Sequence, residues 1–176
     1  MYEDARSGLV VFLAHCILNQ NTRARGVARR RGPFEEVVVL LAEKGIGVVQ
    51  LPCPELEFFQ EIREPSAKDA LDTPEYRAFC RELASRAVNL VNLLLKQKLR
   101  VIGIIGVEHS PSCAVTEVPL SSADLYKYSE GMGVFFEELS QALRESKLNM
   151  RFVGLYSASN KAETNVERLK TLLEEA

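Results

Sequence analysis

Three of the four cysteines in this chain of 176 residues come shortly after a run of apolar residues. A thiolate acts as a nucleophile or as a metal ligand, so three thiols in equivalent surroundings are candidates for one shared site. Their spacings, 37 and 60 residues, match no zinc-finger or zinc-ribbon motif, and only the fold can bring them together. The cysteines and the runs before them are Cys16 after 9–14, Cys53 after 46–51 and Cys113 after 101–106.

Three thiolates without a fourth protein ligand suit two kinds of metal centre. Tetrahedral zinc takes three cysteines and a water, and an iron–sulfur cubane takes three cysteines and leaves its fourth iron open. His15 and His109 lie next to the thiol loops and are candidates for a fourth ligand, although a hydrogen-bonding role is the more ordinary interpretation. Residue types alone leave both metals open.

The apolar runs themselves predict the strands of a parallel sheet. The run 9–14 is short, continuously apolar and rich in β-branched residues, which is typical of a strand covered on both faces. Further strands are predicted over 46–51, 101–106 and 150–156. Helices are expected between and after the strands, where apolar residues recur at spacings of three and four. The predicted helices cover about 33–45, 73–98, 131–146 and 161–175.

Strands and helices alternate along the chain, and this alternation predicts an α/β fold with right-handed crossovers. We expect a single domain over 1–176, built as a three-layer αβα structure. Its Rossmann- or flavodoxin-like parallel sheet would have about four strands in the order 2-1-3-4. In such a sheet all strands end at the same edge, where ligands bind, and neighbouring strands lie about 4.8 Å apart. The three thiols are therefore expected around one opening.

Composition narrows the class of protein. Hydrophobic residues make up 47% of the chain, and the formal net charge is -2, which gives no reason to expect nucleic acid or a membrane as partner. No apolar run approaches the ~18 residues that a membrane span needs, and 1–8 lacks the features of a signal peptide. We therefore expect a cytoplasmic protein, in which thiols stay reduced and serve metal binding or catalysis before disulfides.

Two of the thiol loops resemble motifs of the thiouracil desulfurase family and its desulfidase relatives. The motifs are Cys53-Pro54-Glu55 and Ser110-Pro111-Ser112-Cys113, together with the early Cys16 at a strand end. The resemblance covers about the first 115 residues. It implies a [4Fe-4S] cluster held by Cys16, Cys53 and Cys113, whose open iron binds the sulfur of a small thiolated substrate. The implied activity is non-redox desulfuration, for example of a thionucleobase, with release of sulfide.

Two further residues of these loops are candidates for catalysis. Desulfuration without redox change needs a water activated against the thione carbon and a proton delivered to the intermediate, and a carboxylate such as Glu55 can do both. The resemblance implies an active carboxylate at Glu55 and a catalytic serine at Ser110. The ordinary alternatives are a solvated glutamate and a serine that only forms the turn before Pro111. Ser112 is expected to bond the backbone and shape the loop.

Other residues have weaker or more ordinary interpretations. Cys80 lies on the apolar stripe of the helix predicted over 73–98, so we expect a thiol packed in the core. An arginine-rich loop over 23–31 is either a solvated surface or a contact for a substrate phosphate. The alternative functions are a sensor that binds a cluster without turnover and a binding domain with zinc or with no metal. The loop's arginines are Arg23, Arg25, Arg29, Arg30 and Arg31.

Overall fold

A four-stranded parallel sheet forms the centre of the computed structural model, which describes residues 4–174. The strand order is β2-β1-β3-β6, and all three neighbouring pairs are parallel. Because β6 is the fourth strand predicted from the sequence, the expected order 2-1-3-4 is confirmed. The strands are β1 (Leu9–Leu13), β2 (Gly47–Gln50), β3 (Arg100–Val107) and β6 (Phe152–Leu155).

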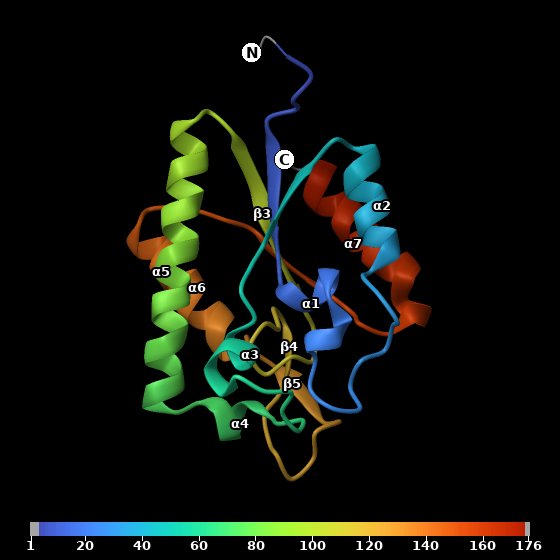
Figure 1. Ribbon diagram of the computed structural model, residues 1–176, viewed down its shortest axis with the longest axis vertical. Helices are drawn as coiled ribbons and strands as arrows, with labels where there is room; N and C mark the ends of the chain where they lie inside the picture. The colour runs from blue at the N-terminus through green and yellow to red at the C-terminus, as the bar shows by residue number, and fades with distance from the viewer. Residues whose placement is uncertain (1–3, 175–176) are drawn as a thin grey trace.

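Two pairs of helices cover the two faces of this sheet. Figure 1 shows α5 and α6 on one side of the strands and α2 and α7 on the other. The result is the three-layer αβα arrangement that the alternation of strands and helices predicts. The covering helices are α2 (Glu35–Glu43), α5 (Pro74–Lys96), α6 (Val134–Glu145) and α7 (Ala162–Glu174).

Burial on both faces explains why the central strands β1 and β3 lack alternating polarity, whereas the edge strand β2 is largely exposed and the expected cover on both of its faces is wrong. In β3 every residue after Arg100 is buried. The longest helix, α5, starts where the Thr73 side chain accepts a hydrogen bond from the backbone N–H of Tyr76 and Pro74 takes the first helical position. Its buried stripe contains Cys80, whose exposed fraction is 0%, so the predicted core thiol is confirmed.

Short elements gather at the end of the sheet where the strands terminate (Figure 1). In the stretch 114–130, where the sequence shows no clear period, β4 and β5 pair as an antiparallel hairpin. Within residues 4–174, no helix is both long and apolar enough to cross a membrane. The short elements are α1 (His15–Leu18), η1 (Gln20–Thr22), α3 (Pro54–Phe59), α4 (Lys68–Leu71), β4 (Glu117–Pro119), β5 (Tyr128–Glu130) and η2 (Ser159–Lys161).

Candidate functional site

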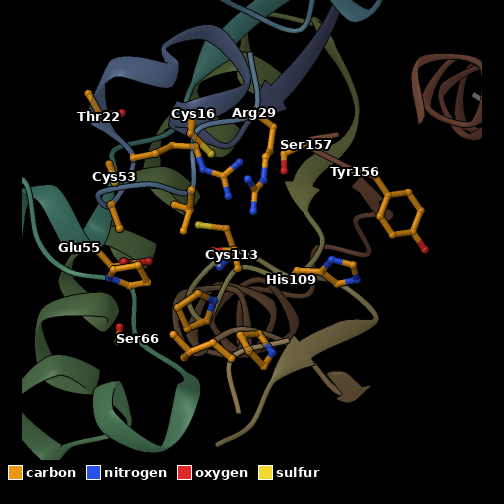
Figure 2. Close-up of a pocket in the computed structure, with 18 of the residues that line it drawn as sticks. Cys16, Thr22, Arg29, Cys53, Glu55, Ser66, His109, Cys113, Tyr156 and Ser157 are labelled. Carbon is orange, nitrogen blue, oxygen red and sulfur yellow. Dashed lines mark hydrogen bonds between the residues drawn. The ribbon is translucent and has the colours of Figure 1, made fainter. Parts of the chain in front are cut away.

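A cavity of about 620 Å³ opens at the C-terminal edge of the sheet and is lined by all three predicted cysteines. Figure 2 shows Cys16, Cys53 and Cys113 together with the side chains around them. The three cysteines therefore line one opening, as predicted, and their role as metal ligands stays a prediction. Among residues 4–174, no group of three or more His, Cys, Asp or Glu side chains is placed closely enough to hold a single metal ion.

The ends of three neighbouring strands hold the cysteines in place. Cys16 lies in the single turn of α1 that follows β1, and Cys53 is the N-cap of α3, which begins shortly after β2. Cys113 lies in the turns after β3, and its carbonyl oxygen accepts a hydrogen bond from Val107 N–H at 3.0 Å. The position of each thiol therefore depends on where the backbone of the neighbouring strand ends.

The surroundings of the three thiols favour the protonated form in the absence of a bound cation. Burial raises the pKa of the Cys53 thiol to about 11 and raises the pKa of Cys16, against the opposing charge of Arg23. Burial also raises the pKa of Cys113, and the neighbouring Cys16 and Cys53 raise it further. A bound metal cation would offset the cost of burying charged thiolates and their mutual repulsion. This donor set therefore fits a thiolate-ligated metal centre.

Glu55 is buried beside the cysteines and is fully engaged by hydrogen-bond donors. Its exposed fraction is 7%. The hydroxyl of Ser112 donates to Oε1 at 2.8 Å, and Nε of Arg63 donates to Oε2 at 2.9 Å. The ordinary interpretation of Glu55 as a solvated loop glutamate is therefore wrong.

Two partners extend this contact on either side of Glu55. Tyr76 Oη lies 2.8 Å from Ser112 Oγ, and because Ser112 gives its only proton to Glu55, Tyr76 is the donor. Burial raises the pKa of Tyr76 above its ordinary value, so the phenol keeps that proton. On the other side, Arg63 Nη1 donates to the carbonyl oxygen of Thr22 at 2.6 Å. Burial acts to lower the pKa of Arg63, but the charge of Glu55, its hydrogen bond and the neighbouring Cys53 and Tyr76 together outweigh burial, and the pKa is raised.

The two serines of the Ser-Pro-Ser-Cys loop make different hydrogen bonds. Ser110 Oγ accepts hydrogen bonds from the backbone N–H groups of Cys113 at 3.0 Å and Ser112 at 3.3 Å, and Ser110 also lines the cavity. Ser112, expected to bond the backbone, contacts Glu55 and Tyr76 through its side chain instead. Sequence reasoning missed this contact, and it missed Arg63 and Tyr76 as its continuation.

A buried carboxylate anchors the segment that follows Cys113. Glu108 is 1% exposed and accepts hydrogen bonds at 3.0 to 3.2 Å from the backbone N–H groups of three consecutive residues. Its other oxygen accepts from the hydroxyl of Thr116 at 2.8 Å. The sequence signal for it was an acidic residue directly after a buried strand. The three backbone donors are Val115, Thr116 and Glu117.

Both histidines line the same cavity but differ in their contacts. His15 Nε2 is buried without a hydrogen-bond partner in the described part of the chain, and burial lowers the pKa of this imidazole. His109 Nε2 lies 3.2 Å from Oε2 of Glu117, and its ring stacks on Tyr128 with centroids 3.5 Å apart. His109 therefore has the hydrogen-bonded setting that the sequence led us to expect. The imidazole of His15 has a hydrogen bond with the backbone of Leu51, and only its Nε2 lacks a partner among residues 4–174.

The arginine-rich loop divides into residues at the cavity and residues elsewhere. Arg23 and Arg29 line the cavity, and Nη1 of Arg23 is buried with no hydrogen-bond partner among residues 4–174. Arg30 instead bonds Glu36 and the carbonyl oxygen of Ser157, at 2.9 and 3.0 Å. Arg25 pairs with an exposed Glu64. Substrate contact thus stays a prediction for Arg23 and Arg29 alone.

Comparison with known proteins places this chain beside an archaeal relative. No family model matches the chain. The uncharacterized protein MJ0003 of Methanocaldococcus jannaschii is 32% identical over 163 residues, which cover 93% of this chain and 94% of that protein. A solved structure, a [4Fe-4S]-dependent thiouracil desulfidase TudS, matches at 18% identity with a TM-score of 0.49, over 93% of this chain and 99% of that one. A likeness this weak says nothing about the activity of this chain.

Proposed function

The chain belongs to the family of MJ0003 from Methanocaldococcus jannaschii, and we propose that it is an enzyme that removes sulfur from a small thiolated compound without net electron transfer. One observation carries this proposal. Three thiols from three strand ends and a buried, hydrogen-bonded Glu55 line one cavity, and the loop of Cys113 contributes Ser112 to that carboxylate. The Cys53-Pro54-Glu55 and Ser110-Pro111-Ser112-Cys113 motifs, which resemble those of thiouracil desulfurases, support the same conclusion.

Cys16, Cys53 and Cys113 would hold a [4Fe-4S] cluster in this function. Three thiolates are the ligands that leave one iron of such a cluster open. When bound, the cluster supplies a Lewis-acidic iron with affinity for sulfur. The raised pKa of all three thiols means that cluster assembly must release protons from them.

The overall reaction is a hydrolysis. A thione and a water give the corresponding carbonyl compound and hydrogen sulfide, so carbon exchanges sulfur for oxygen and no oxidant or reductant is consumed. Glu55 accepts a proton from the attacking water, because it is the carboxylate held at the cavity beside the cysteines. Arg63 and Ser112 fix its orientation, and Ser110 offers a hydroxyl at the cavity wall.

A second candidate function is a sensor that binds the cluster without turnover. The unpartnered, buried Nε2 of His15 at the cavity favours this alternative, since an imidazole there has a free ligand position. A sensor of this kind would bind iron as an enzyme does, but it would release no sulfide from a thione.

Anaerobic reconstitution followed by an assay of sulfide release separates these functions. The protein is loaded with iron and sulfide, analysed for iron and zinc, and incubated with 2-thiouracil and 4-thiouracil while sulfide and uracil are measured. Sulfide and uracil in equal amounts support the enzyme. Iron without product supports the sensor, and zinc without iron contradicts both.

A pair of glutamate variants tests whether the carboxylate of Glu55 takes part in the reaction. Glu55→Gln is expected to keep its iron and lose turnover, whereas Glu57→Gln should change neither. Glu57 is a matched control because it lies on the same short helix α3, with 43% of its side chain exposed and Arg86 as its distant partner. Full activity of Glu55→Gln would remove Glu55 from the mechanism.

A further inference from the structure

Hydrolytic removal of sulfur needs a proton donor as well as a proton acceptor. The attacking water must lose a proton, and the sulfur or ring nitrogen that gains negative charge must receive one. Glu55 has one hydrogen-bond donor on each carboxylate oxygen, Ser112 on Oε1 and Arg63 on Oε2. Each carboxylate oxygen keeps a second lone pair that can accept a proton, but a carboxylate has none to give, so a second group is needed to supply one.

His109 occupies the opposite side of the cavity in an unusual backbone conformation. Figure 2 shows Glu55 and His109 on either side, with Cys113 between them. The φ of His109 is +65°, a left-handed value that is uncommon outside glycine and often found at functional sites. Its backbone N–H donates to the carbonyl oxygen of Glu117 at 2.8 Å, which holds the conformation in place.

The contacts of Glu117 define which nitrogen of His109 carries a proton. Oε2 of Glu117 accepts from the Tyr156 hydroxyl at 3.0 Å and lies 3.2 Å from His109 Nε2. The hydrogen bonds from Tyr156 and then His109 lower the pKa of Glu117, so Glu117 is a carboxylate at neutral pH. Because a carboxylate only accepts, Nε2 of His109 carries the proton.

The other ring nitrogen of His109 remains available. Nδ1 makes no hydrogen bond within residues 4–174, and 31% of the side chain is exposed. Histidine with one nitrogen held by a carboxylate and the other free is the usual arrangement of a general acid or base. The ring is also fixed in its plane, since it stacks on Tyr128 at an interplanar angle of 2°.

The other charged and titratable groups around this imidazole come from separate elements. Arg168 of α7 donates to Tyr156 Oη at 3.0 Å, and Lys161 lies 5.8 Å from the centroid of the Tyr156 ring. Arg29 acts electrostatically on Tyr128. Arg168 also lies 3.5 Å from the buried carboxylate of Glu108, and Asp124 acts electrostatically on Tyr128. Glu117 is thus the carboxylate bonded to the imidazole, with other charged groups farther out.

We propose that His109, oriented by Glu117, is the residue that supplies a proton to the substrate, opposite the proton-accepting Glu55. The inference rests on the proposed hydrolysis. Water forms the new C–O bond while Glu55 takes one of its protons, and protonated His109 donates from Nδ1 to the sulfur. The C–S bond then breaks as the new hydroxyl loses its proton, sulfur leaves as hydrogen sulfide, and proton exchange with solvent restores both residues. The net reaction remains thione plus water giving carbonyl compound plus hydrogen sulfide.

Chemical rescue distinguishes this role from a structural one. His109→Gly suits the backbone, because glycine adopts a φ of +65° without strain, and it leaves a space the size of the lost ring. In the iron-loaded protein with 2-thiouracil or 4-thiouracil, we expect kcat to fall by about 100-fold with KM little changed, and added imidazole to restore about tenfold. Glu117→Gln should lower kcat less and should not respond to imidazole.

The outcomes separate the failure of this inference from the failure of the proposed function. If the wild-type protein turns over substrate and both His109→Gly and His109→Asn are as active as the wild type, the role of His109 is overturned. The proposed function as an enzyme would then still stand. Loss of activity in both variants without imidazole rescue makes His109 a packing residue and also overturns the inference. A wild-type protein that holds iron but releases no sulfide from either compound overturns the proposed function, and this role of His109 with it.

Discussion

Ser112 Oγ lies 2.8 Å from Oε1 of Glu55, so the loop after β3 and the helix after β2 share a buried hydrogen bond across 57 residues of sequence. Tyr76 of α5 completes the contact from a third segment. Because Cys113 follows Ser112 and Cys53 precedes Glu55 by two residues, this contact also couples the positions of two cysteines. The candidate proton acceptor and the candidate metal ligands are thus parts of one packed unit.

Removal of the Ser112 hydroxyl should destabilise the protein. Ser112→Ala leaves the Tyr76 hydroxyl and one oxygen of Glu55 without their buried partner. We expect the free energy of unfolding to fall by about 1–3 kcal/mol, measured by urea denaturation of the metal-free protein. Ser140→Ala, whose hydroxyl accepts from Arg144 at the surface, should change it by less than about 0.5 kcal/mol. Equal stabilities would show that the contact contributes little.

The four cysteines should separate cleanly in a metal-loading experiment. Serine at position 16, 53 or 113 is expected to abolish most iron uptake, because each substitution removes one thiolate from the cavity. Cys80→Ala should keep full iron content, since Cys80 lies in the core between helix and sheet and is absent from the cavity wall. Iron per protein after anaerobic reconstitution is the measurement. Loss of iron in Cys80→Ala with an intact fold would contradict this division.

Most of the sheet and its covering helices were predictable because burial controls their composition. The residues of β3 after Arg100 are apolar since both faces are covered, and α5 shows its buried stripe because only one side meets the sheet. The β4–β5 hairpin was not predictable. Its position depends on Glu108, which bonds the backbone of three residues leading into it, and on the backbone contact of His109 with Glu117. Such tertiary contacts leave no periodic signal.

The site was predictable at the level of strand ends and not at the level of individual hydrogen bonds. Topology alone brings Cys16, Cys53 and Cys113 to one edge. Which serine faces Glu55 depends on the turn after β3, in which the Ser110 hydroxyl accepts from the N–H groups of Ser112 and Cys113. Arg63 returns to Glu55 because the chain reverses after α3 at Gln60, where φ is +56°. Neither fact is readable from residue types.

The stability of the metal-free protein should decrease in alkaline solution. The pKa of Cys53 is raised from 9.0 to about 11, so the folded state keeps a proton that the unfolded state loses. The contribution is complete below the unfolded value and is lost as the pH rises from about 9 towards about 11. Urea denaturation across this interval should show the decrease, and Cys53→Ala should show a smaller one. A stability independent of pH there would contradict the raised pKa.

Gly133 should be intolerant of any side chain because of the loop that carries Cys113. A Cβ at position 133 would lie 2.3 Å from the carbonyl carbon of Ser112 and 2.6 Å from the backbone nitrogen of Cys113. Gly133→Ala must therefore push this loop away from the start of α6. We expect a loss of about 1–3 kcal/mol in the free energy of unfolding and a lower iron content after reconstitution. Gly32→Ala is the matched control, since its Cβ would meet nothing within 4 Å. If Gly133→Ala matched this control in both measurements, the position of Cys113 would not depend on the close approach at Gly133.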